Sequence, residues 1–323
     1  MTLIARPRLR LFLTVVLALL SGPPLAIALA SLSGIGHRWV DILAQFVGPA
    51  LVAAVLLILT SLALRLRTGV LLTGIVGVAV VIAGSPQWFP AKGWPAGDEG
   101  FTVYFANLYA LNTDVETVDA SIRQADPDVV VLIEVSDGVG ASLDALLVDF
   151  PHRAIGPRST DGAGPSRSVI ASRWPLTALR TPFAQLYGVA AAAETPIGPV
   201  TVAGVHLTRP WPYQYQWGQI IQAQELIDWR RTVSGPLIVA GDFNSVSSAR
   251  IGRMIRSKTR LVAAPGWPGT WHAALPAWAG LTIDQVYRSP DLALVDRRLG
   301  RDNGSDHRAV VTRFVRAQAP PTA

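Results

Sequence analysis

The 323-residue sequence contains no cysteine, and only 15% of its residues are charged. The absence of cysteine excludes a disulfide framework, thiolate metal sites and a cysteine nucleophile. The scarcity of charge is uneven, because long stretches of the first 90 residues carry none. A hydrophobic content of 50% is high for a soluble protein, so these stretches matter for where the chain resides.

Three of the uncharged stretches predict transmembrane helices, at about residues 11–33, 42–64 and 69–86. Roughly 20 apolar residues cross a hydrocarbon core about 30 Å thick. The third stretch is the shortest and is rich in glycine, which makes it the weakest of the three. The first could instead be a cleaved signal peptide, because a basic start precedes it and Ala28-Leu29-Ala30 resembles a cleavage site. Its length favours an uncleaved span, so we expect residues 1–90 to form a membrane anchor.

Arginines flank these stretches asymmetrically. Arg6, Arg8 and Arg10 precede the first span, and Arg65 and Arg67 lie between the second and the third. By the positive-inside rule both segments are cytoplasmic, and three crossings leave everything after about residue 90 outside. The sequence therefore predicts a multi-pass protein of the cell (inner) membrane with an extracytoplasmic C-terminal domain. This sidedness reverses if the third stretch does not cross.

The formal net charge of +6 is typical of a nucleic-acid-binding protein, but its distribution argues otherwise. Residues 1–90 hold six arginines and one aspartate, whereas residues 91–323 hold 22 basic and 21 acidic residues. Most of the excess therefore belongs to the membrane topology. Residues 246–323 still carry 12 basic against 5 acidic residues, so a local basic face remains an expectation.

The rest of the chain reads as one mixed α/β domain. Residues 91–100, rich in proline, glycine and tryptophan, predict a linker, residues 101–316 a single domain, and residues 317–323 a disordered tail. Apolar runs predict strands at 102–106, 129–133, 169–171, 201–205, 237–240, 281–286 and 309–314. Helical patterns cover residues 114–125 and 213–231.

Polar residues stand where many of these apolar runs end, which is where an α/β sheet presents its ligand-binding groups. Any one of them could simply be a buried polar residue satisfied by the backbone. Together they indicate a site for phosphate and metal chemistry, and they are Asn107, Glu134, His206, Asp242, Asn244, Asp284, Asp306 and His307.

The residue types suit metal-assisted attack of water on phosphorus. Glu134 and Asp306 are hard oxygen ligands for Mg²⁺ or Mn²⁺, and Asn107 could complete the shell or hold a ligand carboxylate. Asp242 is suited to positioning or activating the water. The other polar groups, Asn244, His206 and His307, can donate to phosphoryl oxygens, and Asp284 would favour a charged imidazole.

In this order and spacing the motifs resemble the endonuclease/exonuclease/phosphatase superfamily, from about Thr102 to Phe314. The matching elements are Ala106-Asn107-Leu108, Ile133-Glu134-Val135, Ser172-Arg173-Trp174-Pro175, Val205-His206-Leu207, Gly241-Asp242-Phe243-Asn244, Ile283-Asp284-Gln285-Val286 and Ser305-Asp306-His307. The resemblance implies a four-layer α/β sandwich, two packed mixed sheets flanked by helices, preceded here by about three transmembrane helices. It also implies Mg²⁺-dependent phosphoester hydrolysis.

By the same resemblance, Glu134 and Asp306 are metal ligands with Asn107 beside them. Asp242 serves the water, Asn244 and His206 bind phosphate, and Asp284 orients His307, although the base is disputed within such families. Two departures are visible. Gln285 stands where histidine is common, and Tyr109 stands where nuclease members often have a second acid, which puts a second metal in doubt.

The substrate stays open, since a fold does not fix it. Arg173 and Arg209 are candidate substrate contacts, and Trp267, Trp271 and Trp278 could line a cleft or rest on lipid. The leading hypothesis is a membrane-anchored hydrolase of a phosphoester, perhaps a lipid-linked one, similar to teicoplanin-resistance membrane proteins of the superfamily. The alternatives are an anchored nuclease for DNA or RNA and a non-catalytic ligand-binding protein. No protein partner is inferred.

Overall fold

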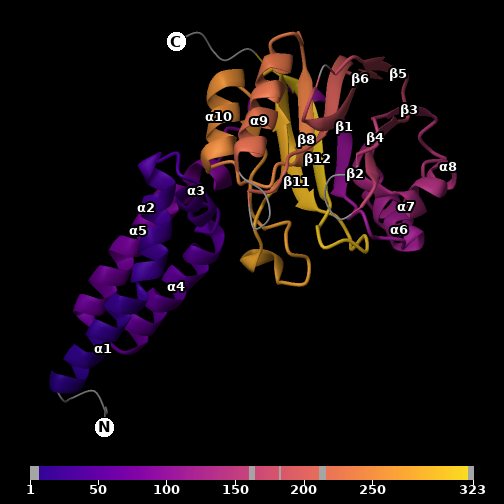
Figure 1. The fold of residues 1–323 in the computed structure, drawn as a ribbon. Coiled ribbons are helices and arrows are strands. Elements are labelled where there is room, and N and C mark those ends of the chain that lie inside the picture. The colour runs from indigo at the N-terminus through magenta and orange to yellow at the C-terminus, as the bar shows by residue number, and fades with distance from the viewer. Residues whose placement is uncertain (1–6, 160–163, 182, 211–215, 319–323) are drawn as a thin grey trace.

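Two six-stranded mixed sheets pack face to face and form the body of the protein (Figure 1). The computed structural model describes residues 7–159, 164–181, 183–210 and 216–318. The first sheet has the strand order β11-β12-β1-β2-β4-β3 and the second β5-β6-β7-β8-β10-β9. The strands are β1 (Pro95–Asn107), β2 (Val129–Ser136), β3 (His152–Ile155), β4 (Ser166–Ser172), β5 (Leu176–Leu179), β6 (Tyr187–Thr195), β7 (Gly198–His206), β8 (Leu237–Asp242), β9 (Val262–Ala263), β10 (Asp284–Arg288), β11 (Leu292–Leu299) and β12 (Val310–Ala317).

Helices cover the outer face of each sheet, which completes the predicted four-layer sandwich. Alternate residues of one strand serve different cores, because successive side chains point to opposite faces. Val103 and Phe105 of β1 pack between the sheets, whereas Tyr104 and Ala106 pack beneath the outer helices. The covering helices are α6 (Val115–Ala125), α7 (Asp137–Ala141) and α8 (Leu143–Leu146) on the first sheet and α9 (Gln216–Arg230) and α10 (Arg250–Thr259) on the second.

The N-terminal region forms a separate helical bundle that projects from one side of the sandwich (Figure 1). Its helices are α1 (Pro7–Leu20), α2 (Gly22–Ser33), α3 (Arg38–Ala44), α4 (Val47–Ala63) and α5 (Arg67–Trp88). Two segments, Pro7–Ser33 and Arg67–Trp88, are long and apolar enough to cross a membrane. The pair α3 and α4 passes the same test only together, and the two are bent by 55°. The described residues therefore contain two candidate spans, or up to three.

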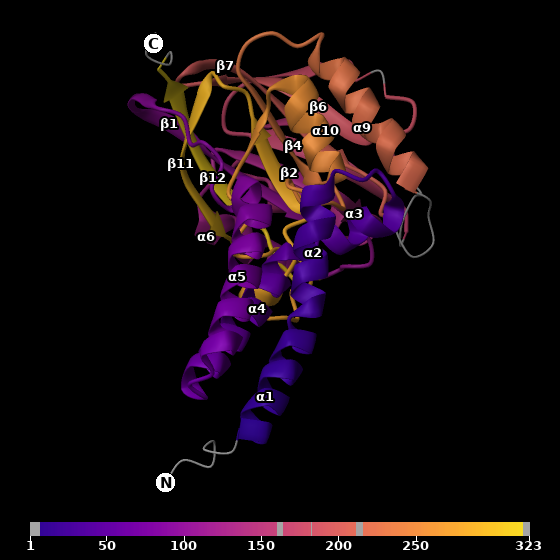
Figure 2. The ribbon, with the colours of Figure 1, turned by 90° about the vertical axis from the view of Figure 1, so that its left-hand side faces the viewer.

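The structure shows which of the predicted spans are continuous helices. The glycine-rich third segment is one continuous 22-residue helix, while the second is broken between α3 and α4. Small residues let α5 pack closely against its neighbours, because a Cβ at Gly77 would lie only 2.9 Å from Ile58 Cδ1. The break lies where α3 turns away to lie against the sandwich beside α10 (Figure 2).

Several strands have other bounds than the sequence predicts. Strand β1 begins at Pro95, inside the stretch predicted to be a linker, and β12 continues to Ala317, where the tail was predicted to start. The remainder of that tail, 319–323, lies outside the described residues, as does 211–215 at the start of the predicted helix 213–231. The predicted strand at 281–286 is found as β10, which begins at Asp284. Strand β6 was missed because four consecutive alanines occupy its centre, and alanine is a poor strand former.

Bundle and sandwich are joined by buried polar contacts as well as apolar ones. Asp41 of α3 is 2% exposed and accepts hydrogen bonds from the backbone N–H of Arg250, at 2.6 Å, and from the side-chain amide of Gln216. At the end of α5, the Gln87 side-chain amide donates to the carbonyl of Gly266 at 3.1 Å, and the Gly266 N–H donates back to the Gln87 carbonyl at 2.7 Å. These contacts fix the sandwich against the upper end of the bundle.

Candidate active site

The predicted polar residues converge because two parallel strand pairs end at the same edge of the sandwich. In the first sheet β1 runs parallel to β2, and in the second β7 runs parallel to β8. His206 and Asp242 are register partners at the ends of β7 and β8, and Asp284 faces Asp242 from the antiparallel β10. Asn107 ends β1, and Glu134 lies near the end of β2.

Two site residues have an unusual left-handed backbone. Glu134 has φ of 51° and lies at an irregularity in the pairing of β2 with β4, and Asn244 has φ of 47°. Non-glycine residues in this region cost roughly 1–3 kcal/mol and are concentrated at functional sites. The Asn244 conformation lets its backbone N–H donate to Asp242 Oδ1 at 2.7 Å. Local strain is thus compensated by hydrogen bonds that orient the carboxylates.

Asn107 links the carboxylates of the two sheets. Its Nδ2 donates to Glu134 Oε1 at 3.0 Å and to Asp242 Oδ2 at 3.2 Å, while its Oδ1 accepts from the backbone N–H of Tyr109. Asn244 Nδ2 donates to Asp242 Oδ2 at 3.2 Å and to the Leu207 carbonyl at 2.9 Å. Both amides therefore hold carboxylates in place in this structure, and the predicted contact of Asn244 with phosphate stays a prediction.

His307 forms a buried pair with Asp284. Its Nδ1 lies 2.9 Å from Asp284 Oδ2, and its Nε2 lies 3.9 Å from Asp242 Oδ2. Burial alone would lower the pKa of His307, but the charge of Asp284 and the hydrogen bond to it, with Asp242 and Asp306 adding to them, raise it to about 10. His307 is therefore a cation at neutral pH, with Nε2 directed toward Asp242.

The other charged groups respond to the same surroundings. Burial, with a smaller contribution from Asp284, raises the pKa of Asp242 to about 7. Burial also opposes ionisation of Glu134, yet His206, Asn107 and other neighbours outweigh it and lower the pKa of this carboxyl. His206 Nε2 lies 3.4 Å from Glu134 Oε1 and 3.8 Å from Asp242 Oδ2. The edge thus combines one firmly ionised carboxylate with one that can exchange a proton near neutral pH.

The donor set fits a divalent cation that prefers oxygen. Glu134, His206 and Asp242 each offer a ligand atom, all within 4.8 Å of one another, and Asp242, Asp284 and His307 form a second such group. Asp306 belongs to neither group, but its Oδ1 is buried without a hydrogen-bond partner among the described residues. An unsatisfied buried carboxylate oxygen is a group that a cation would satisfy. The predicted ligands Glu134, Asp306 and Asn107 remain compatible with this geometry.

Sequence reasoning left the role of Trp271 undecided. Its Nε1 donates to Asp306 Oδ2 at 3.2 Å, and its ring centre lies 6.5 Å from that of His307. Trp267 and Trp278 lie in the same loop but are 48% and 50% exposed. No local pattern distinguishes these three tryptophans, because the loop has no regular periodicity and its contacts depend on the packing of the bundle.

Residues 104–307 match the sequence profile of the Endonuclease/Exonuclease/phosphatase family. The chain belongs to this family. Members of the family are hydrolases that act on phosphoesters, so the site described above is the expected place of that chemistry. No curated protein sequence matches the chain.

Solved structures share the fold of this family member at low sequence identity. An endonuclease/exonuclease/phosphatase from Beutenbergia cavernae DSM 12333 has a TM-score of 0.57 and 20% identity, over 70% of this chain and 74% of that one. One from Bacteroides vulgatus has a TM-score of 0.55 and 16% identity, over 68% and 100%. The human Nocturnin catalytic domain, solved with a bound sulfate anion, has a TM-score of 0.52 and 16% identity, over 69% and 96%. These similarities establish the sandwich and leave the substrate open.

Of the two predicted substrate contacts in this family member, Arg173 lies far from the candidate site. It follows β4, which is antiparallel to β2, and its backbone N–H donates to the Asp128 carbonyl beside the start of β2. Its guanidinium pairs with Asp126. Arg173 therefore lies at the opposite end of the sheet from the site. Arg209 lies three residues after His206, is exposed, and stays a predicted substrate contact.

Proposed function

We propose that this chain is a divalent-metal-dependent phosphoesterase that is anchored in a membrane and hydrolyses lipid-linked phosphoesters at the bilayer surface. One observation carries the proposal: the bundle packs directly against the loops that hold the catalytic residues. Ala30 and Ala44 of the bundle share one apolar cluster with Val246, two residues after Asn244, and with Ile283, next to Asp284. Trp271, which donates to Asp306, packs against the same cluster.

The surface of the bundle supports the membrane anchor. Of the 31 large apolar side chains that are exposed in the described residues, 22 lie between residues 7 and 89. A soluble protein rarely exposes so large a continuous apolar surface. At about 1.5 Å per residue, the 22 residues of α5 extend about 33 Å, enough to cross a hydrocarbon core.

The charge at the two ends of the bundle supports an extracytoplasmic site. Arg8, Arg10, Arg65 and Arg67 lie at the end far from the sandwich, and the Arg10 guanidinium donates to the Arg65 carbonyl at 3.0 Å. Basic residues favour the cytoplasmic side. With that end in the cytoplasm, the sandwich lies on the outer surface, in agreement with the sequence prediction.

The catalytic groups can then be given roles in one displacement. Asp242, held by Asn107 and Asn244, orients the attacking water and accepts its proton. As the water oxygen bonds to phosphorus, the P–O bond to the leaving group breaks, and the leaving oxygen takes a proton from solvent. His307, kept cationic by Asp284, donates to a phosphoryl oxygen through Nε2 and stabilises the charge that develops there. His206 contacts a second phosphoryl oxygen. A bound Mg²⁺ or Mn²⁺, held by Glu134 and Asp306, would supply Lewis-acid stabilisation of the same phosphoryl group.

The loop between β9 and β10 supports a lipid substrate. It contains the short helix η2 (Ala277–Ala279), which contacts α4. The side chains of Trp267, Leu275 and Trp278 in this loop are exposed, and the loop projects from the same side of the sandwich as the bundle (Figure 1). Tryptophan is favoured at the boundary between bilayer and water. These side chains would rest on the bilayer while Trp271 of the same loop contacts Asp306. A substrate embedded in the membrane would therefore reach the site from this side.

The nuclease alternative is weakened by what the basic residues of 246–323 contact. Arg250 and Arg253 donate to carbonyls of Gly36 and Ser31 in the bundle. Arg288, Arg297 and Arg308 likewise donate to carbonyls within the fold. A nucleic-acid interface requires such cations to face phosphates outside the protein. Much of the local basic excess therefore holds the structure together.

The proposal is tested with the full-length protein in phosphatidylcholine nanodiscs, either alone or with an added polyprenyl phosphate or phosphatidylglycerol. We expect turnover of a lipid phosphoester with Mg²⁺ or Mn²⁺, loss of turnover with EDTA, and recovery when the metal is restored. Plasmid nicking at physiological salt serves as the competing assay. Vigorous nicking without lipid turnover would favour the nuclease, and lipid turnover that survives EDTA would exclude the metal-dependent mechanism.

A further inference from the structure

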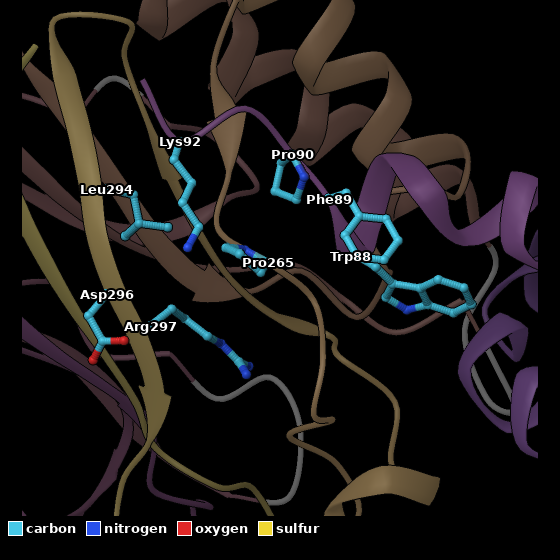
Figure 3. A pocket seen from close by; sticks show the side chains of 8 residues that line it. All are labelled: Trp88, Phe89, Pro90, Lys92, Pro265, Leu294, Asp296 and Arg297. Carbon is cyan, nitrogen blue, oxygen red and sulfur yellow. The ribbon is translucent and has the colours of Figure 1, made fainter. Parts of the chain in front are cut away.

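A second candidate binding site lies away from the catalytic carboxylates, where α5 leaves the bundle and the chain enters β1. It is a cavity of about 430 Å³ between the end of α5, the start of the loop after β9, and strand β11 (Figure 3). None of its lining residues is among the predicted catalytic or metal-binding residues. The lining consists of Trp88, Phe89, Pro90, Lys92, Pro265, Leu294, Asp296 and Arg297.

Two polar atoms of the lining residues are hydrogen-bond donors without an acceptor in the described part of the chain. Trp88 Nε1 and Arg297 Nη2 are both buried and have no hydrogen-bond partner among the described residues. Lys92 adds a second cation, and Figure 3 shows the nitrogen ends of Lys92 and Arg297 on two sides of Pro265. Asp296 is the only acidic residue of the lining. Unsatisfied buried donors are uncommon in folded proteins and indicate a missing partner.

Electrostatics point to the same missing partner. Burial lowers the pKa of Arg297 to about 10, and the charges of Asp284 and Asp296 offset this only in part. The guanidinium stays charged at neutral pH, but its charge is incompletely compensated. An anion with several acceptor oxygens would compensate the charges of Arg297 and Lys92, and phosphate groups have that chemistry.

We propose that this cavity binds the phosphate of an anionic lipid headgroup from the outer leaflet. The proposal rests on the membrane anchoring proposed above, because α5 would bring the cavity to the level of the headgroups. Aromatic residues around it agree with that depth, since Phe89 is 74% and Trp94 68% exposed at the end of a candidate span. The lipid would hold the junction of bundle and sandwich at a fixed height above the bilayer.

The chain offers an internal control for the test, because Lys92 and Lys258 are its only lysines. Lys258 lies in α10, outside the cavity. The full-length protein is reconstituted in nanodiscs of phosphatidylcholine, with or without phosphatidylglycerol, and labelled with an amine-reactive reagent. We expect phosphatidylglycerol to slow labelling of Lys92 by about threefold, which corresponds to two-thirds occupancy, and to leave Lys258 unchanged. Equal labelling of Lys92 in both kinds of nanodisc would overturn the proposal.

Two further arms distinguish the sources of protection. In Arg297→Gln, protection of Lys92 should be lost; protection that persists would reveal a general effect of surface charge and would reject the site. Inorganic phosphate added to phosphatidylcholine nanodiscs should not protect Lys92, and protection by it would overturn the lipid source. Failure of the membrane anchor would be seen separately, as protein released from membranes by alkaline carbonate, whereas failure of this site leaves the protein integrated.

Discussion

The sandwich buries several charged side chains, whereas the bundle buries very few. The catalytic edge gathers four carboxylates and two imidazoles, several of them almost inaccessible, and satisfies them with hydrogen bonds across both sheets. Within the described part of the bundle, Asp41 is the only acidic residue, and its partners belong to the sandwich. One edge of the sandwich is therefore organised by polar contacts, whereas the bundle is organised mainly by apolar packing. Their junction is where substitutions should separate chemistry from membrane attachment.

The largest effect is expected from Asp242→Asn, which changes the sandwich and leaves the bundle intact. The substitution preserves shape but removes the group that accepts the proton, so kcat should fall by about 10²–10⁴-fold. Membrane fractionation and helical content should stay as in the wild type. Asp126→Asn, at the far end of the first sheet, is the matched control and should retain full activity. Equal losses in the two variants would contradict the assigned site.

The convergence of the candidate site residues at one edge could be expected from the sequence, because strand topology places them there. Asn107, His206 and Asp242 each end a strand of a parallel pair, and parallel strands present their carboxyl ends at one edge. Arg173 has the same appearance in sequence, yet it ends an antiparallel strand and lies at the other edge. The direction of a strand depends on long-range pairing, which a single motif does not contain.

The next largest effect is expected at the junction, from Asp41→Leu. This change removes the acceptor of two donors, the Arg250 N–H and the Gln216 amide, and each unsatisfied group costs about 1–3 kcal/mol. We expect turnover of a nanodisc-embedded substrate to fall about tenfold, the equivalent of 1.4 kcal/mol, while hydrolysis of a soluble phosphodiester is unchanged. Asp119→Leu, in an exposed pair on α6, is the control. A parallel loss on the soluble substrate would show that the junction also shapes the site.

Hydropathy alone could not rank the three predicted spans. It recognises apolar length, and on that criterion the glycine-rich segment is the weakest, although in the structure this segment is the continuous 22-residue helix α5. It also cannot foresee that α3 leaves the line of α4, because the reason is Asp41, whose partners Gln216 and Arg250 follow more than 170 residues later. For the same reason the role of Trp271 depends on a cluster formed jointly by bundle and sandwich.

A smaller effect is expected in the loop that we propose rests on the bilayer, from the double substitution of Trp267 and Trp278 by alanine. Each ring is about half exposed, so only part of its apolar surface can move from water to the bilayer, and truncation removes only that part of the transfer free energy. We therefore expect turnover of a nanodisc-embedded substrate to fall roughly two- to fivefold. Hydrolysis of a soluble phosphodiester should not change. Ile155→Ala, on the edge strand β3, removes an equally exposed apolar group away from the bundle and should have no effect. Loss on both substrates would instead indicate that the loop supports Trp271.

The smallest effect is expected from Arg173→Ala, which tests whether the end of the sandwich opposite the candidate site takes part in the reaction. Its partners Asp126 and Asp128 lie at the start of β2, whereas Glu134 lies near the opposite end of that strand. An exposed ion pair contributes about 0–1 kcal/mol to stability, so the melting temperature should fall by only a few degrees. The value of kcat/KM should stay within about twofold, because a residue that never meets the transition state cannot stabilise it. A change in kcat/KM greater than tenfold, without loss of folded protein, would show that Arg173 contacts the substrate. The binding site would then have to reach the opposite end of the first sheet.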